Sequence, residues 1–217
     1  LLFSPQPISY LMRPTSPHPN GPKLFVDAVD YGALFSEINP YESRFTSLLR
    51  MNATYPYILP QVSLPTKPAI QVIDAGVVDN YGLSTSIRFV DVYSDWIMEH
   101  TSGVVFIEIR DMAKFNKVEE VEKKTYLSKF FNPIGNVYSN LTEMQDFHDD
   151  VQLDLLRDKL DGKVEMIRFE YIPPEEEEHA SMSYHLTTKE KVGLIKSLSN
   201  PVNSERFSRL TKVVLAN

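Results

Sequence analysis

The stretch Val72–Gly82, VIDAGVVDNYG, runs from apolar residues into a carboxylate and then into a turn signal. The apolar residues before Asp74 are typical of a buried strand, and Gly76 lets backbone or substrate approach closely. Asp79 and Asn80 form a turn signal, because their side chains can bond local amides. A charged side chain at the end of a buried strand has two interpretations. Asp74 either bonds the amides of the following turn or serves as a base or metal ligand.

Strands and helices alternate on both sides of this stretch. Short apolar runs predict strands over 23–35, 69–76, 103–111 and 163–172. A loop with three prolines is predicted over 58–68. Helical periodicity and capping residues predict helices over residues 45–51, 83–103, 136–161, 187–200 and 204–216.

This alternation favours an α/β fold, layered α/β/α, with a mixed, mostly parallel sheet covered on both faces. Ligand sites in such sheets lie beyond the carboxyl ends of the strands. Asp74 and Asp111 both stand at such ends, and Asp111 is interpreted as a strand-end cap. The end of the strand that carries Asp74 is therefore the candidate site.

The composition excludes several classes of site. The chain has 217 residues, no cysteine and a formal net charge of -7. Without cysteine it holds no disulfide, thiolate nucleophile or zinc–thiolate site. The negative charge argues against a nucleic-acid partner, since neutralising phosphates supplies most of that affinity. Histidines and carboxylates in 147–150 and 175–185 match no defined metal site and are interpreted as solvated acidic segments, so we expect neither metal nor cofactor.

The first 22 residues hold six of the fifteen prolines, which predicts a Pro-rich extended linker over 1–22. The chain begins with Leu1 and shows neither a secretory signal nor an apolar run of the roughly 18 residues that a membrane span requires. We therefore expect a processed or excised part of a longer polypeptide. The sequence favours no particular compartment.

The segment DAGVVDNYG (74–82) resembles the Asp-Gly-Gly/Ala motif of patatin-like acyl hydrolases, which usually continues as Val-Val/Tyr-Asp-Asn. RMNATYPYILPQVSLP (50–65) and LFVDAVDYGALF (24–35) are similar to the segments that precede this motif in the family, in the same order. The resemblance covers roughly residues 23–112 and is general beyond them.

The resemblance implies a serine hydrolase that cleaves lipid acyl esters, such as those of phospholipids, through a Ser-Asp dyad without histidine. Asp74 would be the base that takes the serine proton directly, and Ala75, Gly76, Asp79 and Asn80 would support its motif. Burial and an oxyanion hole would supply much of the barrier reduction, because a carboxylate is a weak base for this task. The resemblance implies no cofactor, and the whole enzyme could bind a membrane surface.

The chain departs from the family in lacking the nucleophile. None of its eight glycines begins a Gly-x-Ser-x-Gly motif, and it has no glycine-rich oxyanion loop. The nearest match, Gly82–Ser86, lacks the second glycine and follows the Asp74 motif, so Ser84 is interpreted as a cap of the next helix. We therefore expect residues 23–217 to be the C-terminal part of a patatin-like domain. The serine would lie on upstream sequence, and the isolated chain would have no hydrolase activity.

Two other interpretations stay open at this point. The fold could persist as a non-catalytic binding or regulatory module, or the resemblance could be accidental and the chain an unrelated α/β domain. Lipid or partner binding that survives Asp74→Asn would favour the binding module.

Overall fold

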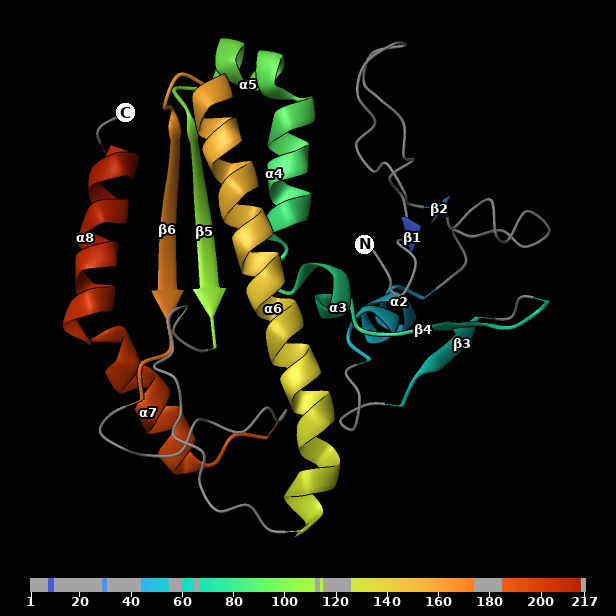
Figure 1. Cartoon of the computed structure of the whole chain (residues 1–217). Coiled ribbons are helices and arrows are strands. Elements are labelled where there is room, and N and C mark those ends of the chain that lie inside the picture. The colour runs from blue at the N-terminus through green and yellow to red at the C-terminus, as the bar shows by residue number, and fades with distance from the viewer. Residues whose placement is uncertain are drawn as a thin grey trace. The chain divides into compact units, whose positions relative to one another are not determined.

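The computed structural model (Figure 1) describes residues 44–54, 60–64, 67–111, 114, 126–173 and 185–215, with the backbone alone over 126–139. The backbone is also described for two short strands, β1 (Ile8–Ser9) and β2 (Val29–Asp30). Seven helices and six strands occur in these residues, which confirms the α/β class. No helix within the described ranges is both long enough and apolar enough to cross a bilayer.

The described strands pair two by two. β1 pairs with β2 in parallel, β3 (Val62–Leu64) with β4 (Ile70–Val72) antiparallel, and β5 (Val104–Arg110) with β6 (Val164–Glu170) in parallel. Within the predicted linker 1–22, Ile8–Ser9 is thus a strand, and the remainder lies outside the described residues. The predicted strand 23–35 is described only at Val29–Asp30.

The chain divides into two compact units, which we describe separately. The first holds residues 1–97 and 130–156, and the second holds residues 98–129 and 157–217. The long helix α6 (Tyr126–Lys159) contributes to both, and it begins earlier than the predicted 136–161. It ends before Gly162, as predicted. The positive φ of Gly162, 75°, lets the chain turn while its N–H bonds the carbonyl of Arg157 at 2.8 Å.

The core of the first unit joins α2 (Phe45–Asn52) to the β3–β4 pair, because α2 carries its apolar residues at helical spacing. The buried side chains of this core are Leu48, Met51, Leu64 and Val72. β3 lies in segment 58–68, for which the sequence predicts a loop. That prediction is wrong over Val62–Leu64. Pro60 and Pro68 lie outside β3 and β4, where they cost no ladder hydrogen bond.

Strand β4 ends at Val72, earlier than the predicted 69–76. The chain then turns at Asp74 and enters the short helix α3 (Gly76–Asp79). The carboxylate therefore follows the strand, as expected, but the strand itself is shorter because the turn begins before the glycine.

Two helices, α4 (Leu83–Val92) and α5 (Ser94–His100), replace the single helix predicted over 83–103. The single-helix prediction is wrong because the helix is interrupted at Tyr93, where φ of -101° and ψ of 16° depart from helical values.

In the second unit, β5 and β6 lie side by side and α8 (Pro201–Leu215) lies along β6 (Figure 1). The rings of Phe169 on β6 and Phe207 on α8 pack with centroids 4.5 Å apart. The helix α7 (Thr188–Leu198) begins at a capping box, in which Thr187 and Glu190 bond each other's backbone N–H. The strands predicted over 103–111 and 163–172 and the helices predicted over 187–200 and 204–216 are confirmed, with small shifts at their ends.

Candidate functional site

Asp74 lies between β4 and α3, and the end of α2 fixes its backbone. The N–H of Asp74 donates to the carbonyl of Thr54 at 3.3 Å, and the N–H of Ala75 donates to the carbonyl of Asn52 at 3.2 Å. The segments 50–65 and 74–82 of the family resemblance therefore contact each other through these backbone bonds.

Thr54 is a residue of this site that the sequence analysis missed. It is fully buried, and its hydroxyl lies within bonding distance of the carbonyls of Met51 (3.2 Å) and Val72 (3.4 Å). It thus ties the end of α2 to the end of β4 while its own carbonyl binds Asp74. In the sequence, the only sign of this role is that Thr54 carries a hydroxyl just beyond a short helix. A threonine in that place is usually interpreted as part of a turn.

One of the two oxygens of the Asp74 carboxylate accepts a hydrogen bond from the protein backbone. The N–H of Gly76 donates to Oδ1 at 2.7 Å, which confirms that Asp74 bonds an amide of the following turn. Within the described part of the chain, no other group bonds this carboxylate. Burial raises the pKa of Asp74 above its ordinary value, and the bond from Gly76 opposes that rise.

The backbone geometry of Ala75 accommodates the alanine of the Asp-Ala-Gly sequence. Ala75 has φ of -65° and ψ of -23°, which any residue adopts, so alanine fits where the family more often has glycine. Gly76 is buried and supplies the N–H that binds Asp74.

Asp79 serves the start of α4 and is not bonded to Asp74. Its two oxygens accept from the N–H groups of Ser84 (3.2 Å) and Thr85 (2.9 Å), the second and third residues of the helix. Gly82, at the N-cap position, has no side chain to do this and adopts φ of 70°. The interpretation of Ser84 as the cap is therefore wrong, because a carboxylate from the preceding turn already occupies the amides.

Asn80 is bonded by Gln145, a residue of α6 that the sequence analysis did not single out. The N–H of Asn80 donates to Oε1 of Gln145 at 3.1 Å. The amide nitrogen of Gln145 donates in turn to the carbonyls of Val77 (2.9 Å) and Gly76 (3.4 Å). One side chain thus bonds three backbone groups of the Asp74 motif.

Asp149, four residues further along α6, accepts a hydrogen bond from the hydroxyl of Ser84. Burial raises the pKa of Asp149; the bond from Ser84 opposes the rise, and the nearby charge of Asp79 adds to it. A serine beside a carboxylate could suggest a second catalytic pair. However, the N–H groups of Ser84 and Thr85 are already bound by Asp79, so they cannot form an oxyanion hole there. We interpret the pair as a structural bond between α4 and α6.

The described residues contain no group of three histidine, aspartate or glutamate side chains that could hold a metal ion. In segment 147–150, His148 lies 2.8 Å from the side chain of Gln152, and Asp149 bonds Ser84. Most of segment 175–185 lies outside the described residues. Asp111 follows β5 directly, at the position predicted for it.

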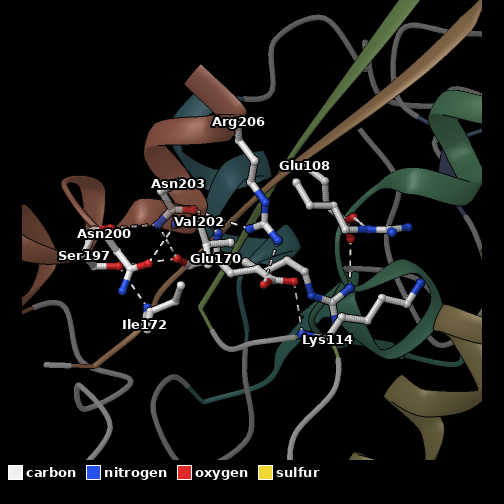
Figure 2. Close-up of polar contacts among 11 residues, drawn as sticks. Glu108, Lys114, Glu170, Ile172, Ser197, Asn200, Val202, Asn203 and Arg206 are labelled. Carbon is white, nitrogen blue, oxygen red and sulfur yellow. Dashed lines mark hydrogen bonds and ion pairs between the residues drawn. The ribbon is translucent and has the colours of Figure 1, made fainter. Parts of the chain in front are cut away.

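A second polar cluster lies at the carboxyl end of β6 and ties it to α7 and α8 (Figure 2). The buried amide of Asn203 donates to the carbonyls of Glu170 and Ser197, each at 2.8 Å, and accepts from the N–H of Glu170 at 3.2 Å. Arg206 bonds the carboxylate of Glu170 at 3.2 Å. Because the side chain of Asn203 has its donors and acceptor occupied, we interpret this cluster as structural.

A third set of charges lies between β5 and β6. The buried carboxylate of Glu108 accepts from Arg110 on its own strand, at 2.9 Å, and from Arg168 on β6. Both carboxylate oxygens are thus occupied, which also favours a structural role.

Comparison of the chain with models of protein families, with characterised proteins and with solved structures finds no match. The patatin-like resemblance therefore rests on the sequence segments quoted above, and the role of Asp74 stays a prediction.

Proposed function

We propose that this chain is the C-terminal part of a patatin-like serine acyl hydrolase that cleaves lipid acyl esters, with Asp74 as the base of a Ser-Asp dyad. The observation that carries the proposal is the state of the Asp74 carboxylate. One oxygen accepts from Gly76, and the other has no bond to any described residue. A partly buried carboxylate with a raised pKa and one available oxygen suits a group that must take a proton from a serine hydroxyl.

In the proposed reaction, the serine oxygen attacks the ester carbonyl as its proton moves to Asp74. The proton then passes to the departing alcohol, which leaves an acyl-enzyme. Water then attacks the acyl-enzyme carbonyl while Asp74 takes its proton, and the fatty acid leaves as the proton returns to the serine oxygen. The serine and the oxyanion donors would come from upstream sequence, so the isolated 217-residue chain would not hydrolyse esters.

The exposed face of β5 supports a larger domain. Ile107 and Ile109 are 53% and 76% exposed, although they alternate with the buried Phe106, Glu108 and Arg110. Parallel strands are normally covered on both faces, and sheets of two strands are only marginally stable. We therefore propose that further elements of the same domain cover this face and complete a layered α/β/α sheet.

The test is ester hydrolysis by the longer polypeptide that contains this chain, in wild-type form and as Asp74→Asn. We expect a loss of about 10³-fold or more in kcat, since removing such a group typically costs that order. Asp91→Asn is the matched control, because Asp91 forms an ion pair with Arg88 on the surface of α4. Circular dichroism checks that all three proteins are folded.

Equal activity of wild type and Asp74→Asn would overturn the proposal. If neither protein hydrolyses esters and both bind lipid vesicles equally, the alternative of a non-catalytic binding or regulatory module takes its place.

A further inference from the structure

Gln145 of α6 bonds both ends of the short helix that follows Asp74. It accepts from the N–H of Asn80 at 3.1 Å and donates to the carbonyls of Val77 at 2.9 Å and Gly76 at 3.4 Å. These partners lie 65 to 69 residues away in the chain, within the same compact unit. The contact is thus a tertiary one that depends on α6 being in place.

The helix α3 needs such support because it is a single turn of four residues. A helix of this length is not stable alone, and its backbone groups at both ends lack partners within the helix. Gln145 supplies partners for two of its carbonyls and for the first N–H beyond it. Together with the bonds from the end of α2 to Asp74 and Ala75, its position on α6 therefore helps to fix where α3 lies.

Gly76 links α3 to the carboxylate. It is the first residue of α3, and its N–H is the donor to Oδ1 of Asp74. A shift of α3 would therefore move or break this bond. One helical turn from Gln145 along α6, Asp149 holds Ser84 in the first turn of α4. Residues four apart share one face of a helix, so a single face of α6 contacts both helices that follow Asp74.

We propose that Gln145 is a positioning residue for Asp74, acting through α3 and the N–H of Gly76. Its catalytic consequence rests on the proposed function, whereas its effect on the turn does not. The side chain donates and accepts at the same time, which a carboxylate or an alkyl group in its place would not do.

The first test is amide hydrogen exchange by the 217-residue chain, as wild type and as Gln145→Ala. The decisive amide is that of Gly76, because its acceptor is Asp74 and not Gln145. We expect its exchange to become roughly fivefold to thirtyfold faster, the factor that corresponds to losing one or two hydrogen bonds. Amides of β5 and β6 should keep their wild-type rates. Gln152→Ala is the matched control, since Gln152 lies on the same helix and contacts His148.

Unchanged exchange at Gly76 would overturn the proposal, and so would a rise that Gln152→Ala matches or that spreads over the whole chain. Gln145→Glu provides a second variant should the alanine variant fold poorly. It keeps the side-chain length and an acceptor for Asn80 but loses the donor to Val77, so the same local rise at Gly76 is expected.

The second test is steady-state kinetics of the longer polypeptide. Gln145→Ala should lower kcat about tenfold to a hundredfold with KM within about twofold, because misplacing a catalytic group by about 1 Å has an effect of that order. An unchanged kcat, where Asp74→Asn abolishes activity, would overturn the positioning role. Full activity of Asp74→Asn would instead refute the proposed function, and the exchange result would still decide whether Gln145 positions the turn.

Discussion

The N–H of Gly76 donates a 2.7 Å hydrogen bond to Oδ1 of Asp74, and this bond opposes the effect of burial on the same carboxylate. Burial is the larger effect, so the pKa of Asp74 is raised from its ordinary value of 3.8. Between that value and the raised one, the folded chain keeps a proton that the unfolded chain has lost. The unfolded chain thus binds fewer protons in this window, and stability falls as pH rises through it.

Asp74→Asn should therefore stabilise the isolated chain slightly at neutral pH. The amide keeps an oxygen for Gly76 but carries no charge to bury. Because Asp74 is only partly buried, the gain should stay below about 1 kcal/mol. Thermal unfolding at pH 7 and near pH 3.5 measures it. A gain that is present at pH 7 and absent near pH 3.5 is expected, and a loss of stability at pH 7 would contradict the assignment of the raised pKa.

Ser84 should not react with a fluorophosphonate probe. Its hydroxyl donates to Asp149, and its own N–H and that of Thr85 are bound by Asp79, so the negative charge that develops on the probe's phosphonyl oxygen would find no donors in this turn. Intact mass after incubation of the 217-residue chain with the probe measures this, and we expect no stoichiometric adduct. A full adduct that disappears in Ser84→Ala would show that this chain holds its own nucleophile.

Glu108→Gln should destabilise the chain by about 3 kcal/mol. It removes the buried negative charge that accepts from Arg110 and Arg168, and breaking a buried pair leaves cations poorly compensated. The midpoint of urea unfolding, followed by circular dichroism, gives the free energy. Glu165→Gln is the control, because its partner Arg209 is 54% exposed and the pair should contribute less than about 1 kcal/mol. Equal effects of the two changes would contradict this account.

Asn203→Ala should cost about 2 to 4 kcal/mol, because it leaves buried backbone groups of Glu170 and Ser197 without partners. Asn200→Ala is a matched change three residues earlier. Asn200 caps α8 by accepting from the N–H of Val202 at 3.0 Å, so its loss should cost about 1 kcal/mol. Urea unfolding of both variants measures the difference. A larger cost at Asn200 than at Asn203 would show that the buried cluster does not hold α7 and α8 to β6.

Elements with strong local signals could be predicted from the sequence. The Thr187–Glu190 capping box marks the start of α7, and Gly162 marks the end of α6. The apolar runs of β5 and β6 are long enough to identify as strands. β3 has only three residues and is flanked by prolines in the sequence. Its apolar pattern is therefore too short to distinguish a strand from a loop.

The candidate site could be predicted only in part. Asp74 follows a strand as expected, because the apolar run and the glycine are neighbours in the sequence. Gln145 and Asp149 could not be found this way, because they bond Asn80 and Ser84 from a helix about 65 residues away and read in the sequence as ordinary polar helix residues. The sequence pattern points to Ser84 as the cap of α4, but Asp79 binds the amides of the first turn from outside the usual capping position.

The charges between β5 and β6 also protect the pair against misalignment during folding. Glu108 lies opposite Arg168 and Arg110 lies opposite Glu170. A slip of two residues in one direction would place Glu108 opposite Glu170, and a slip in the other direction would place Arg110 opposite Arg168. Either error sets like charges against each other, and a slip of one residue would turn the apolar side chains to the wrong face. Two apolar strands that could slide along each other are thus held to a single alignment by four charged side chains.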